Sequence, residues 1–433
     1  MIDLKLQLGD WLAVSLSDHP SMAPEVKVPL LEGRGATPAQ TLGNIVVSIV
    51  GTGVLGLPYA FRTAGWLAGT LGVAGAGAAT FYCMLLLQET EEDGLGDEQS
   101  RHGDGGNYTY GDLGERCFGP VGRHFTEAII VLCQTGGTVA YLVFIGQNIS
   151  SVLPALSPAI VVLALLLPVE VALSFVRSLS ALAPFSILAD ACTVLAVAAV
   201  VKEDVQLLVE RGQPFADRSA FAGLWGVPFA CGVAVFCFEG FCLTLALEAS
   251  MSNRAKFRPV LLQAIAGVTV VYVGFGVCGY LAYGDATRDI VTLNLPSNWS
   301  TAAVKVVLCV ALALTFAVMM HPIHEIVESR LLAPGGWVRR RGGFVERAAL
   351  HLSRVAVVAT LAAIACFVPA FGEFAAFVGS TVCALLSFVL PALFHLRVVG
   401  PTASTWARAV DYFFLLSGLV FAGHGMYTVL SPQ

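Results

Sequence analysis

Long apolar runs separated by short polar segments make up most of this 433-residue chain. A helix needs about 20 predominantly apolar residues to cross the hydrocarbon core of a bilayer. About eleven runs approach or exceed that length, and their approximate ranges are 41–63, 66–88, 125–152, 157–176, 182–202, 224–248, 258–283, 301–321, 350–369, 373–396 and 409–430. The pattern predicts an all-α polytopic membrane protein with eleven transmembrane helices.

The first run is interrupted near its middle by the sequence Gly51-Thr52-Gly53-Val54-Leu55-Gly56-Leu57-Pro58. Glycine and proline are poor helix formers, and unwound backbone survives inside a bilayer only beside protein or a watery cavity. The half-helix after the break directs unpaired N–H groups and a positive dipole end toward it, which suits a small carboxylate. We therefore predict a binding site at Gly51, Thr52 and Gly53. The alternative is that the glycines only let neighbouring helices pack closely.

A second interruption lies five runs later, where Glu239 and Gly240 stand near the middle of an apolar segment. A charged carboxylate at that depth costs about 2.5–3.5 kcal/mol, so it should face a cavity, carry a proton or have a partner. Breaks in the first and sixth helices are what an inverted repeat of five plus five helices would contain, with the eleventh helix outside the repeat. The alternative is that Glu239 hydrogen-bonds to unwound backbone and only shapes the site.

Composition and charge agree with a membrane protein and give it an orientation. Hydrophobic residues make up 56% of the chain and charged residues 12%, against about 25% charged residues in soluble domains. Counted over alternate connections, Lys and Arg number 18 on the side of the N-terminus and 6 on the other side. The positive-inside rule therefore predicts a cytosolic N-terminus and, after eleven spans, a lumenal C-terminus. The acidic segment 89–98 falls in a cytosolic connection and is expected to be a solvated linker.

Motifs of several other protein classes are missing from the sequence. The eleven cysteines lack the paired spacing of zinc ligands, and no phosphate-binding loop, nucleophile elbow or metalloprotease motif occurs. We therefore predict neither an enzyme nor an ATP-driven pump, and no cofactor or metal. A passive channel is disfavoured because nothing in the pattern indicates a continuous polar pore.

The segment from Asn44 to Phe61, followed by Ala64-Gly65-Trp66, resembles the opening signature of the amino acid/auxin permease family. Similar segments follow at 108–113, 141–148 and 238–248, so that the resemblance covers about residues 38–430. Within the family, the segments 177–190 and 321–328 are most similar to the plant and algal vacuolar amino acid transporter branch.

This resemblance implies a LeuT-type fold and secondary active transport of amino acids by residues 38–430, after a largely disordered cytosolic tail at 1–37. The residues that it assigns to the substrate, in the two breaks, are Gly51, Thr52, Gly53, Phe238 and Gly240. Sodium-coupled animal members often carry an asparagine where this chain has Ser48, and this difference favours coupling to protons.

Several other polar residues are candidates for coupling or for the cavity. Glu239 could load a proton from an acidic lumen and release it to the cytosol, and Asp190 in the fifth run is the next candidate. The candidates for the cavity wall share one face of the third helix at i, i+4 and i+7, and they are Gln134, Thr138 and Tyr141. A packing face is the alternative for these three. Tyr272 in the seventh run is interpreted as a packing aromatic, and Glu170 in the fourth run as structural or as part of a proton route.

Together these observations predict a proton-coupled symporter that moves neutral amino acids from the lumen of an acidic, vacuole-like organelle to the cytosol. Its predicted partners are the amino acid, the proton and the lipid bilayer, and nothing predicts a nucleic-acid partner. Two alternatives stay open: an amino acid sensor with the same fold and a sodium-coupled amino acid symporter.

Overall fold

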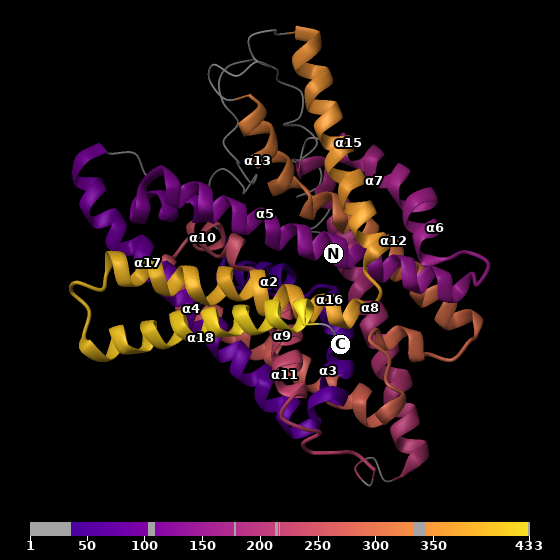
Figure 1. Ribbon diagram of the computed structural model, residues 1–433. Coiled ribbons are helices and arrows are strands. Elements are labelled where there is room, and N and C mark those ends of the chain that lie inside the picture. The colour runs from indigo at the N-terminus through magenta and orange to yellow at the C-terminus, as the bar shows by residue number, and fades with distance from the viewer. Residues whose placement is uncertain are drawn as a thin grey trace.

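The computed structural model describes residues 36–102, 109–176, 179–212, 215, 217–332 and 343–431. Within these ranges the chain is almost entirely helical, and its only β feature is an isolated bridge between Ala36 and Met251 (Figure 1). The helices are α2 (Pro38–Ile49), α3 (Leu57–Ala64), α4 (Trp66–His102), α5 (Tyr110–Val152), α6 (Pro158–Ile160), α7 (Leu167–Ser174), α8 (Leu179–Arg211), α9 (Gly226–Cys237), α10 (Phe241–Ala249), α11 (Phe257–Tyr283), α12 (Trp299–Met319), α13 (His321–Leu331), α15 (Gly343–Phe367), α16 (Phe371–Val378), α17 (Leu390–Val398) and α18 (Thr405–Leu430). Short 3₁₀ or π segments connect them: η2 (Thr52–Gly56), η3 (Val161–Leu166), η4 (Arg254–Lys256), η5 (Gly284–Ala286), η6 (Val291–Asn294), η7 (Gly379–Cys383) and η8 (Leu385–Val389).

Each predicted apolar run corresponds to a helix or to a pair of helices. Among the described residues, eight helices are long and apolar enough to cross a membrane, and the bent pair formed by α2 and η2–α3 makes a ninth. The helix Pro158–Ser174 lies at the fourth predicted run and is shorter, and α8 lies at the fifth. The all-α polytopic architecture is therefore confirmed, while the full count of eleven spans stays a prediction.

The first helix is broken where the glycines predicted it. A capping box between Thr37 and Gln40 starts α2, which ends at Ile49, and the backbone of Val50 and Gly51 is extended. The chain then continues through η2 into α3 at an angle of 51° to α2. Pro58 lies in the first turn of α3, where backbone N–H groups have no helical partner, so its missing N–H costs no helical hydrogen bond.

The sixth helix is also broken, but over a shorter stretch. α9 ends at Cys237 and α10 begins at Phe241, and residues 238–240 between them are not helical. The two halves are aligned closely, and residues 226–249 together are long and apolar enough to cross a membrane as one span. The predicted breaks in the first and sixth helices are thus both present.

The acidic segment after the second span is not a loop. Its residues continue α4, where Glu91 is 4% exposed, and Arg258 of α11 lies 3.3 Å from Glu89 and 3.5 Å from Glu92. The prediction of a linker is wrong for residues 89–92, which are helical, and the prediction of a solvated side chain is wrong for Glu91. Glu89 and Glu92 remain 38% and 52% exposed while they pair with Arg258.

Both ends of the broken first helix are held by hydrogen bonds. At the start of α2, the N–H of Ala36 donates to the Ser250 carbonyl at 2.8 Å, just beyond α10. At the end of α3, Arg62 donates to the Thr287 carbonyl at 2.8 Å, in the connection between α11 and α12. The break therefore lies between two anchored half-helices.

Candidate functional site

The breaks of the first and sixth helices lie against each other. A Cβ atom added to Gly53 would stand 2.8 Å from the Cys237 Sγ atom, and one added to Gly240 would stand 3.0 Å from Cγ1 of Ile49. A side chain at Gly53 would therefore collide with the end of α9, and one at Gly240 would press on Ile49, so the absence of side chains at both positions favours this close approach. The fold brings together the two segments that the sequence singled out separately.

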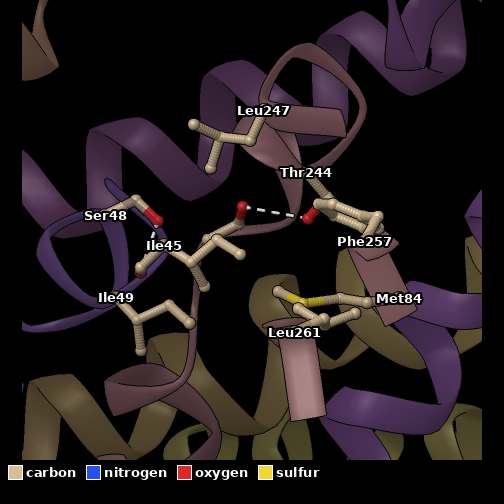
Figure 2. Close-up of a pocket in the computed structure, with 9 residues that line it drawn as sticks. Ile45, Ser48, Ile49, Met84, Thr244, Leu247, Phe257 and Leu261 are labelled. Carbon is tan, nitrogen blue, oxygen red and sulfur yellow. Dashed lines mark hydrogen bonds between the residues drawn. The ribbon is translucent and has the colours of Figure 1, made fainter. Parts of the chain in front are cut away.

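A small hollow with room for about one water molecule lies beside the sixth-helix break, between α2, α4, α10 and α11 (Figure 2). The residues that line it are Ile45, Ser48, Ile49, Met84, Gly240, Thr244, Leu247, Phe257 and Leu261. Its two hydroxyl groups bond to their own helices: Ser48 donates to the Ile45 carbonyl at 2.8 Å, and Thr244 donates to the Gly240 carbonyl at 3.4 Å. The hollow is thus mainly apolar, and its hydroxyls are already bonded.

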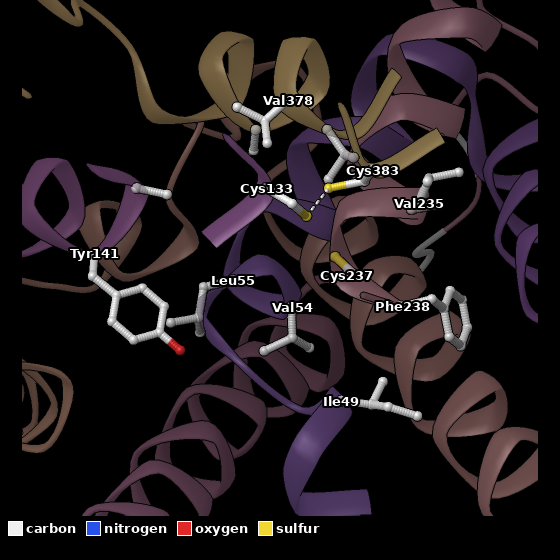
Figure 3. Close-up of a cluster of buried hydrophobic side chains, with 14 of the residues drawn as sticks. Ile49, Val54, Leu55, Cys133, Tyr141, Val235, Cys237, Phe238, Val378 and Cys383 are labelled. Atoms are coloured by element: carbon white, nitrogen blue, oxygen red, sulfur yellow. Dashed lines mark hydrogen bonds between the residues drawn. The ribbon is translucent and has the colours of Figure 1, made fainter. Parts of the chain in front are cut away.

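Gly51 faces a different surface from Gly53. Among the described residues, a Cβ atom at Gly51 would meet only the hydroxyl of Tyr141 on α5, at 3.3 Å. Figure 3 shows the Tyr141 ring beside Leu55, with Val54 between Tyr141 and Phe238. The third helix therefore contributes Tyr141, one of its three predicted residues, to the wall of the first-helix break.

The Thr52 hydroxyl lies inside this break and has no hydrogen-bond partner among the described residues. The residue is 2% exposed. A buried polar group without a partner costs about 1–3 kcal/mol, so such a group is a natural contact for a bound ligand. Thr52 and the N–H groups of the first turn of η2 are the polar groups of the break that can receive a carboxylate.

Phe238 and Tyr272 form the wall on the side of α11. Phe238 is 1% exposed, and its ring centroid lies 5.1 Å from that of Tyr272. The fully buried Tyr272 hydroxyl lies 3.1 Å from the Ile49 carbonyl and 3.1 Å from the Cys237 carbonyl. The interpretation of Tyr272 as a packing aromatic missed this polar role. The available signal was a tyrosine in the middle of a span, since a buried phenol usually needs a hydrogen-bond partner.

The Glu239 carboxylate lies just before the start of α10. Its Oε1 atom lies 4.0 Å from the Cys242 thiol. The first N–H groups of a helix have no helical partner, and a negative charge beside them is stabilised by the helix dipole. Gln134 of α5 is 8% exposed, and its Oε1 atom has no hydrogen-bond partner among the described residues. Glu239 thus stands at a helix end, and Gln134 is a buried acceptor on the third helix.

The remaining candidates are less closely connected with the breaks. Thr138 is fully buried, and its hydroxyl donates to the Gln134 carbonyl of its own helix at 2.8 Å. Asp190 lies in α8, and its side chain is outside the described part of the structure. Glu170 of α7 is 1% exposed, and neither carboxylate oxygen has a hydrogen-bond partner among the described residues.

Comparison with known proteins gives matches over nearly the whole chain. A family model described as "Transmembrane amino acid transporter protein" matches residues 34–431. The protein named amino acid transporter ANT1 of Arabidopsis thaliana is 51% identical over 424 residues, which cover 95% of this chain and 96% of that protein. Amino acid transporter AVT3A of the same plant is 35% identical over 417 residues, covering 94% and 92% of the two chains. Vacuolar amino acid transporter 3 of Schizosaccharomyces pombe is 26% identical over 414 residues, covering 92% and 60%.

Proposed function

This chain belongs to the family of transmembrane amino acid transporter proteins, and on that premise we propose that it moves amino acids across an organelle membrane by secondary active transport. The family is one of transporters and not of enzymes. The observation that carries the proposal is the contact between the two helix breaks, where Gly53 and Gly240 each approach the opposite helix. Broken helices at the middle of a membrane provide unpaired N–H and C=O groups for a small zwitterion.

Each end of the substrate then has a complementary group. The carboxylate meets the Thr52 hydroxyl and the N–H groups at the start of η2, and the ammonium group lies toward the carbonyls that end α2 and α9. The side chain of the substrate meets apolar surface from Val54, Leu55 and Phe238. Apolar walls favour a neutral amino acid, because a charged side chain would lose its hydration there.

The coupling ion in this proposal is a proton, with Glu239 as its first carrier and Asp190 as the second candidate. The Glu239 carboxylate stands just before the N-terminus of α10, where the helix dipole stabilises a negative charge. Protonation removes that charge and its interaction with the dipole, so it acts on the sixth-helix break directly. One proton that moves down a gradient of one pH unit supplies about 1.4 kcal/mol, which is enough for a tenfold gradient of one coupled solute.

The membrane in this proposal is that of a vacuole-like organelle. Vacuolar amino acid transporter 3 of Schizosaccharomyces pombe carries this location in its name. An acidic lumen would drive protons, and the substrate with them, toward the cytosol. The excess of Lys and Arg on the N-terminal side supports a cytosolic N-terminus and a lumenal C-terminus.

Glycan attachment at Asn298 tests this orientation, because the sequence Asn298-Trp299-Ser300 would lie on the lumenal side. Asn298 is exposed, and its Oδ1 atom accepts the Thr301 N–H at 2.8 Å, which leaves the side-chain nitrogen available for the sugar. We expect a mobility shift on gels that is lost in Asn298→Gln. Sugar on Asn107, in a second acceptor sequence outside the described residues, would contradict the orientation.

Counterflow of labelled amino acids into proteoliposomes tests the function itself. We expect several neutral amino acids to exchange and an inward-directed proton gradient to accelerate their uptake. Replacement of sodium by potassium should leave the rate unchanged. Failure of every amino acid to exchange would refute the transport function, and uptake that requires sodium would refute proton coupling.

A further inference from the structure

We propose that Tyr272 is a positioning residue that joins the two broken helices and sets the distance between them. Its hydroxyl lies 3.1 Å from the carbonyl of Ile49 and 3.1 Å from that of Cys237. Ile49 is the last residue of α2, and Cys237 is the last residue of α9. One side chain of α11 therefore contacts the final carbonyls of both half-helices. The substrate role of this geometry rests on the function proposed above.

The chemistry of helix ends explains why such a contact matters. The last carbonyls of a helix lack intrahelical donors and lie at the negative end of the helix dipole. A phenol has a single O–H proton, which it can give to one carbonyl or share between two in a three-centre bond. The carbonyls of Ile49 and Cys237 thus share or compete for one donor. A substrate ammonium group that bonds to one of them would leave the phenol to the other.

Tyr272 is held firmly by a helix that is not itself broken. The residue is fully buried in α11, and its ring packs on Phe238 with centroids 5.1 Å apart. α11 also packs along α2 and α3, on both sides of the first-helix break. Tyr272 is therefore a fixed point against which the two breaks are positioned. Removal of its hydroxyl leaves two buried carbonyls without this donor.

The same helix offers a matched control. Tyr280 also lies in α11 and is 2% exposed, but its hydroxyl accepts the Ser219 N–H at 3.3 Å, away from both breaks. Tyr272→Phe and Tyr280→Phe each remove one buried hydroxyl from the same helix. A general loss of packing or stability would affect both variants alike, whereas a positioning role belongs only to Tyr272.

Amino acid exchange in proteoliposomes measures the effect on the substrate site. We expect Tyr272→Phe to raise the half-saturation concentration about tenfold, with the maximal rate changed by less than about twofold, as expected for one lost hydrogen bond in a binding site. Tyr280→Phe should match the wild type. Incorporation of 4-aminophenylalanine at position 272 restores a donor at the same place and should restore the wild-type value. Equal kinetics for the two phenylalanine variants would overturn the proposal.

Amide hydrogen exchange on the purified protein tests the connection without any transport assay. Tyr272→Phe should increase exchange in both segments, 50–53 and 238–241, while Tyr280→Phe leaves both unchanged. An increase in only one segment, or in neither, would overturn the proposal. If Tyr272→Phe does not fold, the 4-aminophenylalanine form decides: wild-type protection of both segments supports the proposal, and lost protection overturns it. If the wild type exchanges no amino acid, the transport function fails, and the hydrogen-exchange result still decides whether Tyr272 joins the breaks.

Discussion

The break in the first helix and the break in the sixth differ in how their free polar groups are satisfied. In the first, two half-helices meet at 51°, and the buried Thr52 hydroxyl has no partner among the described residues. In the sixth, residues 238–240 interrupt a nearly continuous helix, and the Glu239 carboxylate stands just before the N-terminus of α10. The first break thus has an unused polar group for a ligand, whereas the second contains an ionisable side chain of its own.

In the proposed transport function, this difference gives the two broken helices different roles. The first-helix break is suited to bind the carboxylate of the substrate, because its donors are unused. The sixth-helix break is suited to respond to charge, because an ionisable side chain stands within it at the end of a helix dipole. The two breaks influence each other through their direct contact at Gly53 and Gly240 and through the Tyr272 hydroxyl.

The largest effect is expected from bulk at Gly51. Among the described residues, a Cβ atom there would meet the Tyr141 hydroxyl and no backbone atom within 4 Å, so the Gly51→Val side chain should occupy the space in front of Tyr141. We expect counterflow to fall at least about 100-fold, since small displacements at a reacting or binding centre have effects of that size. Gly43→Val in α2 is the control, because a Cβ atom at Gly43 meets nothing within 4 Å in the described part of the chain. Normal exchange by Gly51→Val would remove the site from the first helix.

Bulk at Gly53 is a less specific probe of the same break. A Cβ atom at Gly53 would stand 2.8 Å from the Cys237 Sγ atom and 3.2 Å from its Cα atom. Gly53→Val should therefore lower stability and exchange together, which a lower midpoint of thermal unfolding would reveal. A variant with full stability and full exchange would contradict the close contact of the two breaks.

A smaller effect on binding is expected from Thr52. Thr52→Ala removes a hydroxyl without a partner in the described structure, which stabilises, and a buried methyl group, whose loss destabilises, so we expect little net change in the stability of the substrate-free protein. The half-saturation concentration for exchange should rise about tenfold through the loss of one hydrogen bond to the substrate. Thr52→Ser retains the hydroxyl and should restore most of the affinity. Equal affinities for the alanine variant and the wild type would show that Thr52 makes no substrate contact.

The sixth-helix break should respond in coupling and not in binding. Glu239→Gln mimics the protonated side chain, and we expect it to retain exchange while it loses acceleration by a pH gradient. Both quantities are to be measured on one purified preparation, so that differences in expression do not enter. If a pH gradient still drives accumulation in this variant, Glu239 is not the proton site. Asp190→Asn would then be the next variant to test.

The smallest effect is expected from Ser48 in the hollow beside the sixth-helix break. Its hydroxyl already donates to the Ile45 carbonyl of its own helix. Ser48→Ala should change stability by no more than about 0.5 kcal/mol, and it should change exchange little in either sodium or potassium buffer. Loss of a sodium-dependent part of the transport in this variant would instead support the sodium-coupled alternative.

Local signals in the sequence were sufficient for the breaks but not for their surroundings. Clustered glycines before Pro58, and the Glu239-Gly240 pair, predicted both interruptions because backbone preferences act locally. The contact of Tyr272 with both breaks depends on how three distant helices pack, and no spacing along the chain encodes it. The acidic end of α4 was predicted as a linker for the same reason, since its partner Arg258 comes from α11.

The face predicted on the third helix shows the same limit at the level of side chains. Its three residues share a face by helical spacing, but Tyr141 reaches the first-helix break, the Gln134 Oε1 atom has no partner among the described residues, and the Thr138 hydroxyl bonds to its own backbone. Spacing gives the direction of a side chain from its helix. It does not give the partner that a hydroxyl or amide finds there.

Binding of the exchanged amino acid at the first-helix break is tested most directly by thermal unfolding of purified protein with and without that amino acid. A ligand at 100 times its dissociation constant stabilises the folded state by about 2.7 kcal/mol. The wild type and Gly43→Val should therefore unfold at a higher temperature when the amino acid is present, while Gly51→Val should show no increase. An increase in Gly51→Val equal to that of the wild type would contradict a substrate site at this break.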